Sequence, residues 1–342
     1  TELLDLDTET AMGHIELARW ADLILIAPAS ANFIARYAHG FAEDLLSCIC
    51  LASDSLVVVA PSMNQQMWSN AATQQNVKSI CERGVQVIGP ATGEQACGED
   101  GPGRMLEPEE IVKNTTDIFQ TNILTGSRLL VTAGPTREAI DPIRFLSNRS
   151  SGRMGYAVAT AAAEAGADVT LISGPVNIDA TETIRVINVT SAEQMHQSVM
   201  QKISSTDIFI SAAAVADFKV HKISEEKIKK SDSTQKLVLE NTLDILSQVT
   251  TLNDAPFTVG FAAETENVEI NAQKKMHSKN LDMIAANKVG ENIGIDSEEN
   301  ALTVFWKTGS EQLPLTSKNK LARQLIKIIA LQYNEKNSNQ TH

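Results

Sequence analysis

Apolar runs rich in β-branched residues alternate with amphipathic segments along the whole chain. In the first part, three short apolar runs bounded by turn residues predict strands. These runs lie at 22–27, 55–60 and 85–89. The segments between them predict helices, one ending near Gly40 and another over 69–84. A further helix is expected to follow Pro108 and to end near Asn122.

The second part repeats this pattern of strands and helices. The predicted strands lie at 128–133, 168–174, 183–189, 207–218, 259–265 and 282–287. Ser191 and Gln194 form the signature of a capping box and predict a helix start. A hairpin is expected around 307–309, followed by an amphipathic helix from about Ser317. The polar tail 335–342 is predicted to be disordered.

The small polar residues of 121–128 interrupt the alternation, which indicates a domain boundary. A chain of 342 residues with 43% hydrophobic side chains exceeds the size at which one core stops growing. We therefore predict two domains, 1–127 and 128–342. The alternation of strands and helices indicates an α/β protein with two Rossmann-like domains and mostly parallel sheets.

Charge and cysteine content limit the binding partners and the cellular compartment that the sequence predicts. The chain has 29 basic and 42 acidic residues and a formal charge of -13, which argues against a nucleic-acid or anionic-membrane surface. Its longest apolar runs, such as 23–29 and 56–61, are shorter than the roughly 20 residues that span a bilayer. The four cysteines are Cys48, Cys50, Cys81 and Cys97. They form no disulfide framework or usual zinc spacing, so a reducing, cytoplasmic setting is expected.

Three motifs of the first part carry polar side chains suited to chemistry. They are MGHIEL with His14, PSMNQQMW with Asn64 and ACGEDGPGRM with Cys97. Asn64 directly follows a predicted strand, where open α/β sheets bind ligands. The structural alternatives are a capping histidine, an asparagine in a left-handed turn and a cysteine that acts as a small hydrophobe. In the segment 27–32, backbone N–H groups and the Ser30 hydroxyl are suited to an anionic or heteroaromatic ligand.

Lysines are the candidate ligands for anions in the second part. Lys227 lies in a segment of alternating charge, which could instead be a solvated surface. Lys275 and Lys279 are four residues apart and therefore share one face of a predicted helix. Like charges at this spacing repel each other unless an anion lies between them. The pair therefore indicates a site for an anionic substrate.

Taken together, the motifs resemble a known family. The three motifs of the first part resemble the flavin-containing cysteine decarboxylases. The second part resembles phosphopantothenate-cysteine ligases through TAGPTRE, SNRSSGRMG, AAAVADF, EKIKK and VGFAAET. The whole chain is similar to the bifunctional coenzyme A biosynthesis proteins of bacteria. The resemblance implies a flavodoxin-like flavoprotein domain followed by a ligase domain.

The resemblance also implies two reactions and their cofactors. The ligase would join 4'-phosphopantothenate to cysteine through an acyl-cytidylate formed from CTP with Mg²⁺. The decarboxylase would then convert the product to 4'-phosphopantetheine with FMN. In that step His14 would act as base, Asn64 would bind the substrate carboxylate and Cys97 would donate a proton. Ser30 and Asn32 would lie against FMN.

For the ligase, the resemblance assigns Lys227 to the first step and Asn148 to handling of the acyl-cytidylate. Asp217 would contact the nucleotide or Mg²⁺. The nucleotide residues implied are Ser211, Ala212, Ala213, Asp217, Lys227, Leu243, Asp244, Ile245, Phe261, Lys275 and Lys279. Leu243 replaces the family's usual proline, so we expect a less rigid loop.

The family's first strand and glycine-rich phosphate turn precede the histidine by several dozen residues, whereas Thr1 stands close to His14. We therefore expect the first domain to lack both. The resemblance also implies a homo-oligomer acting on small molecules. One alternative is a flavin-binding regulatory protein of the same fold without catalysis. A nicotinamide-dependent dehydrogenase is disfavoured because no G-x-G-x-x-G follows a predicted strand.

Overall fold

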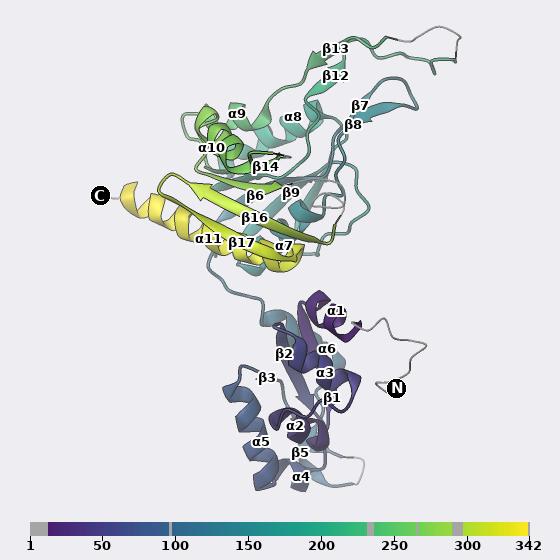
Figure 1. The fold of residues 1–342 in the computed structure, drawn as a ribbon, viewed down its shortest axis with the longest axis vertical. Helices are drawn as coiled ribbons and strands as arrows, with labels where there is room; N and C mark the ends of the chain where they lie inside the picture. Colours follow the sequence, from purple (N-terminus) through teal and green to yellow (C-terminus); the bar gives the residue numbers. More distant parts are fainter. Residues whose placement is uncertain (1–12, 96–97, 231–235, 265, 289–296, 341–342) are drawn as a thin grey trace. The chain divides into compact units, whose positions relative to one another are not determined.

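The structure, a computed structural model, describes residues 13–95, 98–230, 236–264, 266–288 and 297–340. It forms two compact units, the first ending at Phe119 and the second beginning at Gln120 (Figure 1). The polar break at 121–128 packs with the second unit. Leu124 is only 1% exposed, and its N–H donates to the carbonyl of Ala165 at 2.8 Å. A single apolar side chain within a polar segment therefore joins it to a core.

The first unit contains three strands in one parallel sheet, ordered β1-β2-β3. The strands are β1 (Leu23–Ala29), β2 (Leu56–Pro61) and β3 (Gln86–Val87). The helices are α1 (Gly13–Trp20), α2 (Ala31–Ala38), α3 (Leu45–Ala52), α4 (Gln65–Ser69), α5 (Ala71–Glu82) and α6 (Pro108–Asp117). A separate antiparallel hairpin pairs β4 (Ala91–Glu94) with β5 (Asp100–Arg104). The three strands predicted for this part are confirmed.

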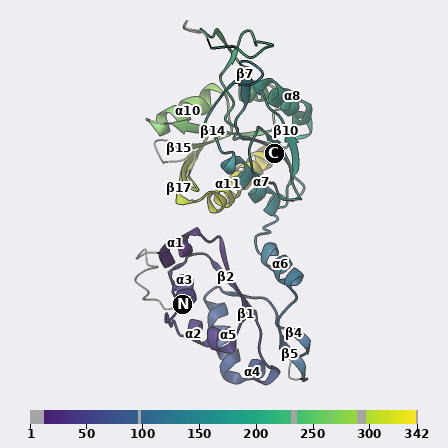
Figure 2. The same cartoon turned by 90° about the vertical axis from the view of Figure 1, so that its right-hand side faces the viewer.

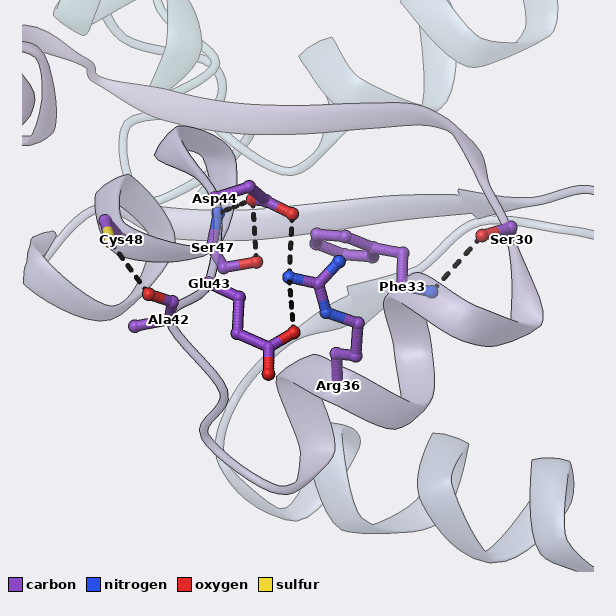
Figure 3. Close-up of polar contacts among 8 residues, drawn as sticks. All are labelled: Ser30, Phe33, Arg36, Ala42, Glu43, Asp44, Ser47 and Cys48. Atoms are coloured by element: carbon purple, nitrogen blue, oxygen red, sulfur yellow. Dashed lines mark hydrogen bonds and ion pairs between the residues drawn. The ribbon is translucent and has the colours of Figure 1, made fainter. Parts of the chain in front are cut away.

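Polar caps connect α2 to α3 (Figure 3). The Ser30 hydroxyl accepts from the N–H of Phe33 at 3.2 Å and begins α2. Asp44 begins α3 by accepting from the N–H of Ser47 at 2.8 Å, and it also pairs with Arg36 at 2.8 Å. The hydrogen bonds from Ser47, followed by the Arg36 charge, hold the pKa of Asp44 below its usual value. The same carboxylate thus caps one helix and ties it to the previous one.

The second unit contains an eight-stranded sheet ordered β10-β9-β6-β11-β14-β15-β16-β17. Its strands are β6 (Arg128–Ala133), β9 (Asp168–Ser173), β10 (Arg185–Asn188), β11 (Ile208–Ser211), β14 (Phe257–Glu264), β15 (Met283–Lys288), β16 (Glu299–Trp306) and β17 (Gly309–Ser317). The first six strands in this order, β10-β9-β6-β11-β14-β15, are parallel, and β16 and β17 add an antiparallel edge. This is the mostly parallel α/β architecture predicted from the sequence.

Helices cover both faces of this sheet (Figures 1 and 2). They are α7 (Arg153–Glu164), α8 (Ala192–Lys202), α9 (Ile245–Thr250), α10 (Val268–Ser278) and α11 (Lys318–Gln340). A short 3₁₀ turn (Ile203–Ser205) follows α8. Buried side chains of α7 and α11 form one core, and those of α8, α9 and α10 form a second. The central strands contribute to both cores, which explains their nearly continuous apolar sequences.

Two small hairpins project from one end of this unit (Figure 1). One pairs β7 (Arg137–Ala139) with β8 (Phe145–Ser147), and the other pairs β12 (Phe218–Val220) with β13 (Leu239–Asn241). Strands β7 and β12 contact each other. The sequence did not predict these hairpins because strands of three residues carry too short a pattern to be detected.

Two predictions for the second unit are wrong. The strand expected over 207–218 ends at Ser211, and an isolated bridge between Ala214 and Pro135 follows it. The tail expected to be disordered is helical as far as Gln340. Lys336 pairs with Asp282 at 2.7 Å and lies over the Phe257 ring, so this end of α11 is anchored to the sheet. The last two residues of the tail lie outside the described residues.

Candidate functional sites

A cavity of about 350 Å³ opens at the carboxyl ends of β11 and β14 in the second unit. It is lined by Ser211, Ala213, Val215, Ala216, Asp217, Asn241, Thr242, Leu243, Asp244, Ile245, Leu246, Phe261, Lys275 and Lys279. Parallel strands place their following loops at one edge of a sheet, which is where such folds bind ligands. The cavity therefore gathers the predicted nucleotide residues except Ala212 and Lys227.

Two lysines supply positive charge to this cavity. The Lys275 ammonium group donates to the carbonyl of Phe261 at 2.8 Å, and Lys279 pairs with Asp244 at 2.6 Å. Burial, followed by repulsion from Lys279, lowers the pKa of Lys275. An anion bound between the two lysines would relieve this repulsion and favour the protonated form of Lys275.

The loop around Leu243 is fixed on both sides by hydrogen bonds. The hydroxyl of Thr242 donates to the carbonyl of Ala216 at 2.6 Å, and the backbone N–H of Thr242 donates to the carbonyl of Asp217 at 3.0 Å. Asp244 then begins α9 by accepting from the N–H of Ser247 at 3.0 Å. Leu243 itself is 48% exposed. These bonds hold the backbone on both sides of Leu243.

The segment after β11 is held by Thr132. The N–H of Ala212 donates to the Thr132 carbonyl at 3.2 Å, and that of Ala213 donates to its hydroxyl at 3.4 Å. Ser211 and Ala213 line the cavity, whereas Ala212 does not. Thr132 is buried in β6, so the neighbouring strand sets the position of this wall.

Asn148 and Lys227 occupy different surroundings. The side-chain amide of Asn148 donates to the carbonyl of Val215 at 2.9 Å, which places Asn148 against the wall of the cavity. Lys227 is exposed on the segment that follows β12 and does not line the cavity. The structure thus brings Asn148, Lys275 and Lys279 to the same cavity region, but not Lys227.

The cavity offers carboxylates from Asp217 and Asp244. Within the described ranges, no cluster of three or more His, Cys, Asp or Glu side chains is placed to hold a metal ion. Mg²⁺ usually keeps several waters and takes one or two protein carboxylates together with substrate phosphates. The donor set is therefore compatible with an ion that arrives with a nucleotide.

A second cavity, of about 600 Å³, lies in the first unit. It is lined by Ser62, Met63, Asn64, Glu94, Gln95, Gly103, Arg104, Met105, Leu106, Glu107 and Pro108. Asn64 begins α4 in an extended conformation with φ -60°, so it is not the left-handed turn residue considered as an alternative. Its amide nitrogen donates to Glu99 at 2.7 Å, and its oxygen accepts from the N–H of Gln66 at 2.8 Å. These contacts fix the carboxamide at the cavity wall.

Of the other predicted residues of the first unit, those that the structure describes do not line this cavity. His14 is half-buried in the first turn of α1, which packs against α3. Ser30 and Asn32 are exposed at the start of α2. Cys97 lies outside the described residues.

Strand β1 ends beside α2 with a surface that a planar ring could cover. Leu25 is 40% exposed, and Ala27 and Pro28 are also exposed. Ala27 and Pro28 lie just before the first turn of α2 in the sequence, and the N–H groups of such a turn favour polar or anionic acceptors. Apolar surface next to such donors is compatible with one face of a flavin and its polar edge.

Sequence reasoning missed several residues in both cavities. Asn241 and Thr242 directly precede Leu243 and Asp244 in the sequence, so these neighbours could have indicated them. Glu99 belongs to the cysteine motif, but its contact with Asn64 links positions 35 residues apart. The side-chain nitrogen of Gln95 donates to the carbonyl of Pro102 at 3.4 Å, and its side-chain oxygen accepts from the backbone N–H of Gln65. Such contacts leave no local pattern in the sequence.

No helix among the residues placed by the structure is long and apolar enough to cross a membrane.

Comparison with known families finds two matches. Residues 4–120 match the family model described as Flavoprotein. Residues 124–332 match the model described as DNA/pantothenate metabolism flavoprotein C-terminal domain. The two matches follow each other along the chain.

Full-length relatives are also found. The chain is 52% identical over 331 residues to the coenzyme A biosynthesis bifunctional protein of Vibrio cholerae, covering 96% of this chain and 83% of that protein. It is 47% identical over 343 residues to the protein of the same name from Escherichia coli, covering 98% and 84%.

Solved structures resemble the second unit. The crystal structure of the C-terminal domain of a coenzyme A biosynthesis bifunctional protein is 38% identical, with a TM-score of 0.54, covering 63% of this chain and 100% of that one. The DNA/pantothenate metabolism flavoprotein from Streptococcus pneumoniae is 21% identical, with a TM-score of 0.53, covering 60% and 98%. The latter likeness concerns the fold alone.

Proposed function

The chain belongs to the family of coenzyme A biosynthesis bifunctional proteins, and we propose that its first unit carries the decarboxylase site and its second unit the ligase site. Its activities are phosphopantothenoylcysteine decarboxylation and the joining of phosphopantothenate to cysteine. The second unit would act first, because its amide product is the substrate of the first.

In the ligase site, CTP would lie in the cavity at the ends of β11 and β14. Lys275 and Lys279 would neutralise its phosphates, and Asp217 would help to hold Mg²⁺. The carboxylate of 4'-phosphopantothenate attacks the α-phosphorus of CTP, forming the acyl-cytidylate and releasing pyrophosphate. The cysteine amine then attacks the acyl carbon, and CMP leaves with the electron pair of the broken bond.

Further assignments complete the ligase site. Lys227 would stabilise charge during the activation step, and Asn148 would orient the acyl-cytidylate for attack. Backbone groups of Ser211 and Ala213, which line the cavity, and those of 243–245 would surround the nucleotide, with Phe261 near its base. The observation that supports this proposal is the gathering of Lys275, Lys279, Asp217 and Asp244 around one cavity.

In the decarboxylase site, Ser30, Asn32 and the exposed end of β1 would hold FMN. When it is bound, FMN supplies the electron acceptor that makes loss of CO₂ from a cysteine carboxylate accessible. Asn64 would bind that carboxylate through its amide nitrogen. A ring nitrogen of His14 would accept a proton, and the Cys97 thiol would return one to the product.

The remaining assignments concern setting and partners. The substrates are small molecules. We propose that the protein is a cytoplasmic homo-oligomer. We also propose that it binds neither nucleic acid nor membranes, which the formal charge of -13 supports. Sedimentation of the purified chain across a range of concentrations tests the oligomer, and a single monomeric species throughout would contradict it.

The ligase site is tested by replacing its lysines. We expect Lys275→Gln and Lys279→Gln each to weaken CTP binding about tenfold, because each removes a charge from the phosphate site. Lys274→Gln is the matched control, since Lys274 lies on the same helix but is exposed and outside the cavity. Pyrophosphate release is measured against CTP concentration with phosphopantothenate, Mg²⁺ and cysteine. Equal effects of all three substitutions would contradict the assignment.

The decarboxylase site is tested at Asn64. Asn64→Asp keeps an oxygen for the helix cap but places a negative charge beside the substrate carboxylate, so we expect CO₂ release to fall about 100-fold. Asn70→Asp is the control, because Asn70 caps α5 in the same way, by accepting from the N–H of Ala72. Both proteins are reconstituted with FMN, and flavin absorbance is recorded beforehand. Unchanged CO₂ release by Asn64→Asp would remove Asn64 from the site.

A further inference from the structure

The segment that carries Lys227 depends on a neighbouring hairpin for its position. Residues 221–230 follow β12 and form neither helix nor strand. The N–H of Ser224 donates to the carbonyl of Ile140 at 3.0 Å, in the turn between β7 and β8. This contact joins positions far apart in the sequence. The placement of Lys227 is therefore set from outside its own segment.

The turn between β7 and β8 contains a buried carboxylate, Asp141. It accepts from the N–H groups of Ile143 and Arg144, each at 2.8 Å, and from that of Ile228 at 3.2 Å. Burial by itself would raise the pKa of Asp141, but these hydrogen bonds and the Arg144 charge hold it below its usual value. Asp141 therefore stays charged at neutral pH.

Arg144 completes the arrangement by binding the other backbone polar group of Ile228. Its guanidinium group pairs with Asp141 at 3.3 Å and donates to the carbonyl of Ile228 at 3.1 Å. Both backbone polar groups of the residue after Lys227 are thus held by one ion pair. Hydrogen bonds to charged groups are stronger than those between neutral groups.

We propose that Asp141 is a positioning residue for Lys227 in the activation step, acting through the backbone of Ile228 together with Arg144. The proposal rests on the function proposed above for Lys227. Asp141 would not touch the substrate itself. Asp141 holds the peptide bond between Lys227 and Ile228 in place, and this fixes the backbone from which the Lys227 ammonium group extends.

Asp141→Asn tests the contact with little change in shape. The amide can accept through one oxygen only, and its NH₂ group would face at least one backbone N–H that now meets a carboxylate oxygen. The Ile228 peptide would lose its fixed position. A misplacement of about 1 Å can lower a catalytic rate as much as 100-fold. We expect pyrophosphate release to fall about 10- to 100-fold, with a smaller change in the KM for CTP.

The two half-reactions separate positioning from a general structural effect. The full chain is given CTP and phosphopantothenate in one assay, and synthetic 4'-phosphopantothenoyl-CMP with cysteine in the other. We expect Asp141→Asn to slow the first and to leave the second unchanged, because Lys227 serves activation only. Equal losses in both assays, or no loss in the first, would overturn the proposal.

A matched control is Glu138→Gln. Glu138 is a buried carboxylate of the same hairpin, but it accepts from the N–H of Ala192 and not from the Lys227 segment. Glu138→Gln should therefore leave the ratio of the two half-reaction rates as it is in the unsubstituted chain. If the control shifts this ratio as strongly as Asp141→Asn does, the effect belongs to the hairpin as a whole and the positioning role is excluded.

Two more variants separate the possible failures. Ile228→Pro removes the backbone N–H of Ile228 that donates to Asp141 and leaves the side chains of the β7–β8 hairpin unchanged, so it should reproduce the selective loss even if Asp141→Asn does not fold. Lys227→Gln tests the underlying assignment. Full activation by Lys227→Gln would show that Lys227 has no such function. Loss of activation by Lys227→Gln, with full activation by both Asp141→Asn and Ile228→Pro, would overturn the positioning role alone.

Discussion

Lys275 illustrates how a single residue can be tuned by its surroundings. Its ammonium group is half-buried and donates to the Phe261 carbonyl, with Lys279 on the same side of α10. Burial and this second positive charge lower the pKa of Lys275 from its ordinary value of 10.5. The lysine therefore releases its proton at a lower pH than a lysine in water would.

The lowered pKa predicts a pH dependence of nucleotide binding. Only protonated Lys275 attracts the phosphates, so CTP affinity should fall as the pH rises through the alkaline range below 10.5. Binding should be accompanied by proton uptake, because the anion favours the charged form. Calorimetry in buffers of different ionisation enthalpy measures both effects. In Lys275→Gln the pH dependence should flatten, and an unchanged profile would exclude Lys275 as its source.

At the scale of elements, α7 and β6 approach each other unusually closely at Gly155. A Cβ atom added there would lie 2.5 Å from the Cβ of Ala133 and 3.0 Å from its Cα. The neighbour is strand backbone and cannot move aside as a flexible side chain would. The glycine thus allows a helix of small residues to pack directly on the sheet.

This contact reverses the usual effect of a glycine-to-alanine substitution. In an exposed helix, alanine would stabilise by about 1 kcal/mol. At Gly155 we expect alanine to destabilise the second unit by about 1–3 kcal/mol, because the added methyl group overpacks the interface. Urea denaturation of the variant and of the unsubstituted chain measures the difference. A higher midpoint for Gly155→Ala would contradict the close packing of α7 on β6.

At the scale of the whole molecule, the boundary between the two units depends on the core in which the side chains near it are buried. The polar segment 121–128 reads as a linker, yet Leu124 is buried in the core formed with α7. The N–H of Thr121 also donates to the carbonyl of Glu164 at 2.9 Å. The second unit therefore uses residues that precede β6.

These contacts predict different stabilities for two fragments. The fragment 120–342 should be more stable than 128–342, because it retains Leu124. Within 120–342, Leu124→Ala should lower the free energy of unfolding by about 2–5 kcal/mol. Trp306 is the one tryptophan in either fragment, so its fluorescence follows unfolding directly. Equal stabilities of the two fragments would show that residues 120–127 act only as a linker.

The sequence by itself determined the α/β class, most central strands of both units and the motifs that identify the family. Strands such as β2 and β9 are predictable because burial imposes a local apolar pattern on consecutive residues. The residues proposed to contact the nucleotide were predicted from the resemblance to the ligase family, and most of them line one cavity.

Only the tertiary structure decided how distant segments meet. It ended β11 at Ser211, extended α11 to Gln340 and placed Leu124 in a core. It also joined Asp141 to Ile228, a hydrogen bond between residues 87 positions apart. A local pattern records whether a residue is buried, but it does not record which partner buries it. That choice is made by the packing of the whole unit.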